Sequence, residues 1–260
     1  MPVKLLHTLC ILLLAGLSGA CGKLDTPTPG TYRAQITLRG GDVPFELQIK
    51  NDTGQTTLAI VRNEALLPLT EVALREGTLE AQLPDAAGTL HASIGRGELK
   101  GEVRLTDPHG KPQALPFAAE LDERYRFVEK ASTDNADISG YWQLEAIGPE
   151  HFTEPVTLHL EQRFDAVDGR LLLPDGQQIA LLGQVHGDEV YLSALGQGRA
   201  ILLTGRVNHQ GELQGEAWIN LGDANHWVAR RLLDEQAVGL STLDEPVRTV
   251  ALPWAIPTGN

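Results

Sequence analysis

Short stretches in which apolar and polar residues alternate follow one another along most of the chain. The first two span residues 32–38 and 43–49, and Gly40-Gly41-Asp42 separates them. Alternation with a period of two predicts strands with one buried face, and a break rich in Gly and Asp predicts a hairpin turn. The pattern continues to Leu121, where it has predicted about eight strands and no helix of useful length. The first half of the chain is therefore expected to be all-β.

The same layout begins again after the polar stretch 132–137. Four segments recur in the same order, at offsets between 110 and 114 residues. A period of this length is too long for a solenoid repeat and suits a duplicated domain of about 100 residues. We therefore predict two tandem domains, residues 30–130 and 137–236. The matching pairs are Gly30-Thr31-Tyr32 with Gly140-Tyr141-Trp142, residues 44–47 with 155–158, 97–102 with 211–216, and 121–123 with 233–235.

The number and spacing of the strands favour a closed architecture for each domain. About eight antiparallel strands joined by short turns, each with one apolar face, leave exposed edges unless the sheet closes. The sequence therefore predicts two antiparallel meander β-barrels of the lipocalin-like kind, with a two-sheet sandwich as the alternative. Strand tilt and register decide whether such a barrel is filled or hollow, and the sequence leaves that question open.

The N-terminus has the layout of a secretory signal peptide, residues 1–20. Lys4 precedes an apolar run at 5–17, and small residues lead to Cys21. The run of about 13 residues is shorter than the roughly 20 that a transmembrane helix needs. The segment resembles a bacterial lipobox, with Ser18 where Leu is favoured. That resemblance implies lipidation of Cys21, whereas ordinary secretion is the alternative.

The lipobox resemblance also implies a location. Gly22, rather than an Asp, follows Cys21, which implies anchoring at the outer membrane of a bacterial cell envelope, facing the periplasm. Several acyl chains would anchor the chain stably. Residues 21–29, with two prolines, are expected to form a tether between the lipid and the folded body.

Charge and sulfur content exclude several function classes. The net charge is −13, and no basic run is longer than Arg230-Arg231, so nucleic acid is not expected as a partner. Removal of the signal peptide would leave Cys21 as the only cysteine. A disulfide, a Cys-x-x-Cys redox pair or a thiolate zinc site then cannot form within the chain. Copper sites that use Met are also excluded, because Met1 is the only methionine.

A search for catalytic motifs finds none. The chain contains no His-Glu-x-x-His, no Ca²⁺-loop signature and no Gly-x-Ser-x-Gly. The glycine-rich segment 196–198 precedes a predicted strand rather than the helix that a phosphate loop requires. Adjacent acids in an acidic protein are usually solvated surface. We therefore predict no catalytic residue, no metal and no cofactor.

Aromatic residues give the only candidate binding site. Trp142, Trp218 and Trp227 lie near strand ends in the second predicted domain, and His226 adjoins Trp227. These four residues are predicted either to line a site for a carbohydrate or a small apolar ligand, or to fill the barrel core. The tail at 237–260 contains Pro253 and Pro257, which do not suit a central strand. It is expected to lie on a domain surface, bind a partner or be disordered.

Residues of the second unit carry a further resemblance. It rests on Ile138-Ser139-Gly140-Tyr141-Trp142, on 182–193, on 211–218 and on 226–231. These segments resemble the β-rich region that precedes the thioredoxin-like domain in bacterial envelope lipoproteins of the TlpA-type disulfide reductase and peroxiredoxin-like group. The resemblance covers about residues 30–236 and implies architecture and location. The reactive Cys-x-x-Cys of that family has no counterpart here, so its redox activity is not carried over.

These observations favour a non-catalytic, lipid-anchored envelope protein that acts as a binding or scaffold module. Its expected partners are the membrane, through the lipid, and either a small apolar ligand or an envelope redox protein. One alternative is an accessory subunit for a separate thioredoxin-like or peroxidase protein. A further alternative is a hydrolase with a cleft between the two domains.

Overall fold

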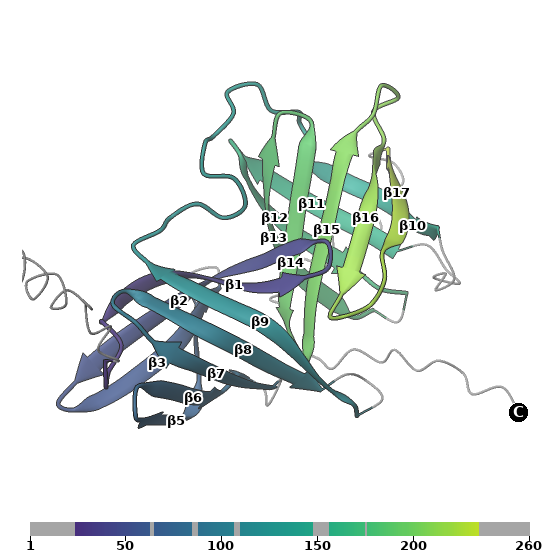
Figure 1. Cartoon of the computed structure of the whole chain (residues 1–260). Coiled ribbons are helices and arrows are strands. Elements are labelled where there is room, and N and C mark those ends of the chain that lie inside the picture. Colours follow the sequence, from purple (N-terminus) through teal and green to yellow (C-terminus); the bar gives the residue numbers. More distant parts are fainter. Residues whose placement is uncertain are drawn as a thin grey trace, which may run out of the picture.

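The computed structural model describes residues 24–62, 65–84, 88–106, 110–147, 156–174 and 176–233. The predicted signal peptide, Cys21 and the tail at 237–260 lie outside these residues. The described part forms two β-sheet units one after the other (Figure 1). It contains no helix that is long and apolar enough to span a membrane.

The first unit is a sheet of nine antiparallel strands in the order β4-β3-β2-β1-β9-β8-β7-β6-β5. The first and last strands of this unit pair with each other, which curls the sheet into a nearly closed barrel. Its strands are β1 (Gly30–Leu38), β2 (Gly41–Asp52), β3 (Gln55–Arg62), β4 (Ala65–Pro68), β5 (Thr70–Arg75), β6 (Thr78–Gln82), β7 (Gly88–Ile94), β8 (Glu98–Thr106) and β9 (Pro112–Leu121).

A break in one strand keeps the first barrel from closing. Only Leu69 separates β4 from β5, yet β4 pairs with β3 while β5 pairs with β6. The register shifts between Thr70 and Ala73, and Glu71 has a φ of 52°, an unusual backbone for a residue other than glycine. Taken as one interrupted strand, β4 and β5 give this unit the same eight-strand course as the second.

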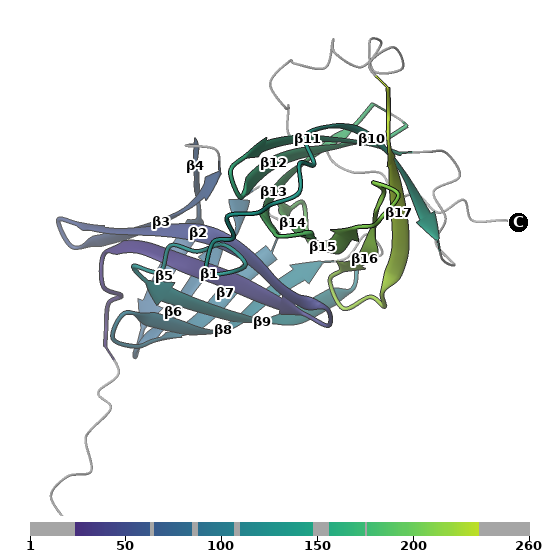
Figure 2. The same cartoon turned by 90° about the horizontal axis from the view of Figure 1, so that it is seen from above.

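The second unit is a closed eight-stranded barrel in which each strand pairs with the next and β17 pairs with β10. Figure 2 looks along this barrel. The two barrels confirm the predicted all-β, lipocalin-like tandem fold. The strands of the second barrel are β10 (Gly140–Ile147), β11 (Val156–Arg163), β12 (Ala166–Leu172), β13 (Gln178–His186), β14 (Glu189–Gly196), β15 (Arg199–Val207), β16 (Leu213–Ile219) and β17 (Asn225–Arg231).

The first strands of the two units are built alike. Tyr32 lies opposite Leu47, and Trp142 lies opposite Leu158, which matches the offset found in the sequence. The Tyr32 hydroxyl donates to the carbonyl of Thr28 at 2.7 Å, and the Trp142 indole donates to the carbonyl of Ile138 at 2.9 Å. Each aromatic side chain thus holds the backbone four residues before it.

The repeated Gly-Glu-Leu segments also occupy equivalent places, in β8 and β16. A Cβ on Gly101 would lie 2.0 Å from the carbonyl oxygen of His91, and a Cβ on Gly215 would lie 1.9 Å from that of Thr204. Both oxygens belong to the preceding strand of the same sheet. Glycine recurs at this position because the neighbouring backbone occupies the space of a side chain.

The two barrels share a packed interface. The β1–β2 hairpin reaches across the outer face of the second barrel at β14 and β15 (Figures 1 and 2). Ala200, Leu202 and Trp218 on that face belong to the hydrophobic core of the first unit. Gly40, in the hairpin turn, leaves the room that the Trp218 ring needs, because a Cβ there would lie 2.2 Å from the indole Cδ2.

Polar contacts border this interface. Arg39 in the hairpin turn pairs with Asp223, and the Arg62 guanidinium donates to the carbonyl of Leu195. The first contact reaches the turn between β16 and β17, and the second reaches the last residues of β14. Apolar packing and flanking polar contacts therefore fix the barrels against each other.

The segment between the barrels is bound to the second of them. The side-chain oxygen of Gln184 accepts hydrogen bonds from the backbone N–H groups of Phe127 and Val128, both at 2.9 Å. The Gln184 amide nitrogen donates back to the Val128 carbonyl at 3.1 Å. The Phe127 ring stacks on Tyr191 with centroids 5.4 Å apart. The connection is thus an ordered part of the interface.

Candidate functional site

The interior of the second barrel has an apolar wall. Strand alternation points one set of residues inward from all eight strands, and these residues form the core cluster of this unit. Gly205 and Gly215 lie opposite each other on adjacent strands and face this interior. The indole of Trp227 lies over them, because a Cβ on Gly205 would be 2.7 Å from its Cζ2 atom.

One end of this barrel is sealed. Ile138, which precedes β10, is fully buried in the core. At the same end the guanidinium carbon of Arg231 lies 4.4 Å from the centroid of the Trp142 ring, within the range of a cation–π contact. The Arg231 guanidinium also donates to the backbone carbonyls of Asp137, at 2.8 Å, and Ser139. Segment 137–139 is therefore tied across the end where β10 begins.

Two polar side chains of this barrel face its interior, and one of them lies at the opposite end. β15 and β17 both run antiparallel to β16, so they begin at the same end of the barrel. Arg199 begins β15 and alternates with the inward residues Ile201 and Leu203. Only 4% of its surface is exposed, and this burial lowers the pKa of its guanidinium. A cation is thus held at the end of an apolar interior.

Trp227 supplies the second polar group. The residue is 2% exposed, and its indole N–H has no hydrogen-bond acceptor among the described residues. The equivalent residue of the first barrel is Phe117, because Phe117 lies opposite Gly101 as Trp227 lies opposite Gly215. The first barrel therefore has a ring without a polar atom at this position, and the second has an unused donor.

The two barrels differ in their buried polar groups as well. Among the described residues, the buried polar or charged side chains are Gln184, Ser193, Arg199 and Asn220, all in the second unit. Gln184 binds the connecting segment, and Asn220 binds the backbone of the β14–β15 turn. By strand alternation, Arg199 is the member of this set that faces the interior. The interior of the second barrel is therefore the better candidate for a binding site.

The residues predicted to bind a ligand separate into two groups. Trp142 and Trp227 lie inside the second barrel, one at the sealed end and one over the inward glycines. Trp218 points outward and packs against the first unit. His226 also points outward, with 67% of its side chain exposed and its Nδ1 atom 3.7 Å from Glu216 Oε1. The four side chains thus do not share one cavity.

Sequence reasoning missed Arg199. Its signal was the alternation of Arg199, Ile201 and Leu203 along one strand, which assigns all three to the same face. An arginine at the end of a strand is usually solvated, so the alternation alone did not distinguish it. The closure of the sheet into a barrel decides which face of β15 is turned toward the interior.

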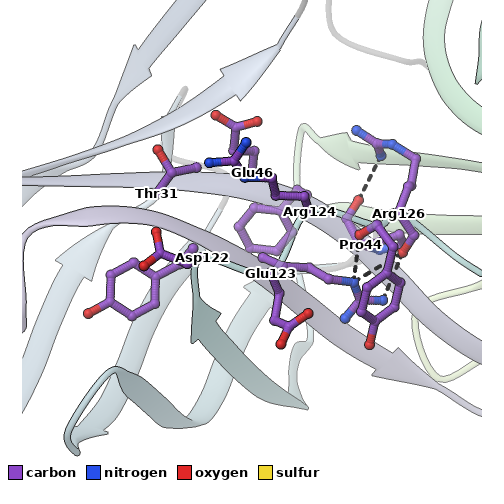
Figure 3. Close-up of a pocket in the computed structure, with 11 residues that line it drawn as sticks. Thr31, Pro44, Glu46, Asp122, Glu123, Arg124 and Arg126 are labelled. Carbon is purple, nitrogen blue, oxygen red and sulfur yellow. Dashed lines mark hydrogen bonds between the residues drawn. The ribbon is translucent and has the colours of Figure 1, made fainter. Parts of the chain in front are cut away.

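A second concave region lies outside the first barrel. It is a groove of about 420 Å³ between the outer side of β1 and β2 and the segment that follows β9. Figure 3 shows acidic and basic side chains around it, among them Glu46, Asp122 and Glu123, with Arg124 and Arg126.

Two arginines in this groove hold the connecting segment in place. Arg33 donates to the carbonyls of Tyr125, at 2.9 Å, and Arg126, and its Cζ atom lies 4.2 Å from the centroid of the Tyr125 ring. Arg126 donates to the carbonyl of Pro44 at 2.9 Å. Burial lowers the pKa of Arg126 to about 10. Because both guanidiniums bind backbone carbonyls, the groove serves the attachment of the connection to the first barrel.

The described residues contain no group of three or more His, Cys, Asp or Glu side chains placed to hold a metal ion. Comparison with known proteins gives no functional assignment. No protein-family model matches the chain, and no curated protein matches it. A similar solved structure is a crystal structure of a DUF3598-family protein of unknown function from Nostoc punctiforme PCC 73102. It is 14% identical, with a TM-score of 0.27, over 79% of this chain and 96% of that one.

Proposed function

We propose that this chain is a non-catalytic, lipid-anchored protein of the bacterial envelope that binds a small apolar molecule inside its second barrel. The observation that carries the proposal is the Trp227 N–H, which is buried in an apolar interior and has no acceptor in the part of the chain that the structure describes. An unmade hydrogen bond of this kind costs roughly 1–3 kcal/mol. A bound molecule with an acceptor atom would remove that cost.

The architecture supports this reading. An eight-stranded barrel has an interior just wide enough to be filled by side chains or to hold one small ligand. One end of the second barrel is sealed by Ile138 and by the Arg231–Trp142 contact. A molecule would therefore enter from the end where β15 and β17 begin. The first barrel, which packs against the second, would serve as its platform.

The lipid anchor is part of the proposal. The lipobox-like sequence ends at Cys21, and Leu24 already packs against the first barrel. Three residues span at most about 10–11 Å, so lipidation would hold the first barrel directly at the membrane surface. The Cys21→Ser variant tests the location. Release of this variant from the membrane fraction supports lipidation, and unchanged membrane partitioning contradicts it.

Binding is tested with the full mature chain carrying Cys21→Ser, which keeps every described residue and needs no detergent. The neutral fluorescent probe N-phenyl-naphthylamine is titrated, and energy transfer from tryptophan reports its entry into the barrel. The blocking variant is Ala217→Phe, because Ala217 faces the interior next to the core. Ala180→Phe is the control, because Ala180 lies on the outer face of β13.

We expect saturable binding by the parent chain and the control, and loss of binding in the folded Ala217→Phe variant. Equal binding by the blocked and the control variants would place the probe outside the barrel and contradict the proposal. Failure of the parent chain to bind the probe, together with native mass spectra that show no co-purified molecule, would also contradict it. A thioredoxin-like protein recovered by in-cell cross-linking would instead favour the accessory-subunit alternative.

A further inference from the structure

The two ends of the first barrel differ in what covers them. The end where β1 finishes is covered by the second barrel. Strand residues and the hairpin turn at this end make the contacts between the barrels, namely Arg39, Gly40, Arg62 and Gln113. Figure 1 shows the second barrel on the opposite side of the first barrel from the start of β1. The end where β1 begins is therefore left for another contact.

That other end holds the start of the folded chain. Leu24 packs against the core of the first barrel. The carbonyl of Pro27 accepts a hydrogen bond from the Asn51 side chain at 2.9 Å, and the carbonyl of Thr28 accepts one from the Tyr32 hydroxyl at 2.7 Å. Because β1 begins and β2 ends here, these contacts fix the tether to one end of the barrel, which we call the tether end.

Strand directions place three hairpin turns at the tether end. Each strand of the first unit is antiparallel to the strand that it pairs with. The β2–β3, β5–β6 and β7–β8 turns therefore lie at the same end as the start of β1. They span residues 53–54, 76–77 and 95–97. With the tether, they form the surface of the first barrel nearest to Cys21, which is three residues before Leu24.

Exposed cations gather in or beside these turns. Lys50, Arg75 and Arg96 are exposed, and none of them forms an ion pair or a side-chain hydrogen bond within the part of the chain that the structure describes. The exposed Arg206 and Arg230 of the second barrel differ, because each of them pairs with two carboxylates. The tether end thus presents cations that are available to an outside acceptor.

The same surface also carries carboxylates. Asp52 and Glu76 lie in or beside the same turns as the cations and are exposed as well. The other exposed charged residues near this end are Asp25, Asp122, Glu123 and Arg124. A surface with both signs of charge matches phospholipid head groups that contain a phosphate and an ammonium group. Arginine and lysine form charge-assisted hydrogen bonds with phosphate oxygens, and carboxylates attract the ammonium group.

We propose that the tether end of the first barrel rests on a phospholipid surface, with Lys50, Arg75 and Arg96 bound to head-group phosphates. This inference rests on the lipid anchor of the proposed function and names the surface that contacts the membrane. The nine residues of β1 span about 27 Å of strand. With a strand tilt of about 40°, this is about 20 Å along the barrel axis. The first barrel would therefore hold the second barrel away from the membrane.

The test uses the full lipidated mature chain in phosphatidylcholine vesicles, in which part of the lipid carries a nitroxide on its head group. Cys21 is the only cysteine of the mature chain and is occupied by the lipid, so an introduced cysteine is the only free thiol for a fluorescent label. Thr53→Cys places the label in the β2–β3 turn. Leu66→Cys is the matched control, because Leu66 is 49% exposed and lies near the start of β4, at the opposite end of the same barrel.

We expect the nitroxide to quench the label at residue 53 several-fold more than the label at residue 66. Joint replacement of Lys50, Arg75 and Arg96 by Gln should remove most of the quenching at residue 53, because the contact with the phosphates is lost. The control for this change is the joint replacement of Arg104, Arg163 and Arg206 by Gln. It removes the same charge from exposed arginines that pair with carboxylates elsewhere, and it should leave the quenching at residue 53 unchanged.

Two results would overturn the inference while the lipid anchor stands. Equal or stronger quenching at residue 66 would show that the barrel lies on its side or meets the membrane with its other end. Equal quenching at residue 53 in the two triple variants would show that the three cations do not bind the head groups. Failure of the parent chain to float with the vesicles is a different outcome, because it would reject the lipid anchor and this inference with it.

Discussion

One close contact in the interface between the barrels can be isolated by a double-mutant cycle. The Trp218 ring occupies the space that a side chain on Gly40 would need, with indole carbons 2.2 Å from the position of a Cβ. Trp218 itself is 8% exposed, and it packs in the core of the first unit although it belongs to the second. Gly40→Ala would therefore force the hairpin turn and the ring apart.

The magnitudes follow from this geometry. Overpacking of a well-packed core costs typically 1–3 kcal/mol, and we expect Gly40→Ala to lower the free energy of unfolding by about this amount. Trp218→Ala leaves a cavity and should lower it by about 3–5 kcal/mol. In the Trp218→Ala background the space beside residue 40 is empty, so the further change Gly40→Ala should alter the free energy of unfolding by less than about 0.5 kcal/mol. The two effects are thus strongly non-additive.

The assay is urea denaturation of the four chains followed by far-ultraviolet circular dichroism, which does not depend on the tryptophan that is removed. Leu221→Ala is the control for truncation near the interface, because Leu221 is 41% exposed. That control should change the free energy of unfolding by less than about 0.5–1 kcal/mol. An equal effect of Gly40→Ala in the parent and the Trp218→Ala backgrounds would refute the assigned contact.

Three further predictions concern other parts of the fold. Gly215→Ala would bring a Cβ within 1.9 Å of the Thr204 carbonyl oxygen. Because neither atom can be moved by side-chain rotation, this variant should lower the free energy of unfolding by at least about 1–3 kcal/mol. An unchanged thermal midpoint would contradict this. Gln184→Leu removes the acceptor shared by two backbone N–H groups of the connecting segment, so those two amides should exchange hydrogen faster while the amides of β13 do not. Burial, and then the hydrogen bond to Glu189, raise the pKa of Tyr191 to about 12 from the usual tyrosine value of 10.0. Between these pH values the folded chain keeps a proton that the unfolded chain releases, so stability should fall as pH rises through this window. Tyr191→Phe should remove that part of the decline, and an identical alkaline profile for the variant would argue against the raised pKa.

The sequence predicts the positions of the strands better than it predicts how completely each sheet closes into a barrel. The alternation at 32–38 and 43–49 and the turn between them appear in the structure as β1, β2 and their hairpin. The repeat also predicted which residues are equivalent, because Gly101 and Gly215 meet the same kind of backbone neighbour. The break around Leu69 gave no clear signal, since it depends on a register shift that only the paired strands define.

The candidate site was predictable only in part, for a related reason. Trp142 and Trp227 were identified as aromatic residues near strand ends, and both lie inside the second barrel. Trp218 has the same residue type and a similar place in its strand, but it faces outward and serves the interface. A period of two defines the faces of a strand and does not say which face another domain covers. The contact with Gly40, a long-range feature of the fold, decides this.

The equivalence of the two barrels makes their differences informative about function. The last strand of each barrel pairs with the first. In the first barrel Leu121 lies opposite Tyr32, and in the second Arg231 lies opposite Trp142. The polar atom of each aromatic side chain donates a hydrogen bond to a backbone carbonyl, so the two barrels have the same arrangement at this end.

The interiors of the two barrels differ in their polar groups. Phe117 in the first barrel needs no hydrogen-bond partner, whereas the buried N–H of Trp227 in the second has no acceptor among the described residues, and Arg199 adds a buried charge. A buried donor without an acceptor is unfavourable in a core that serves stability alone. This difference between two barrels of similar course supports the proposal that a ligand binds in the second barrel.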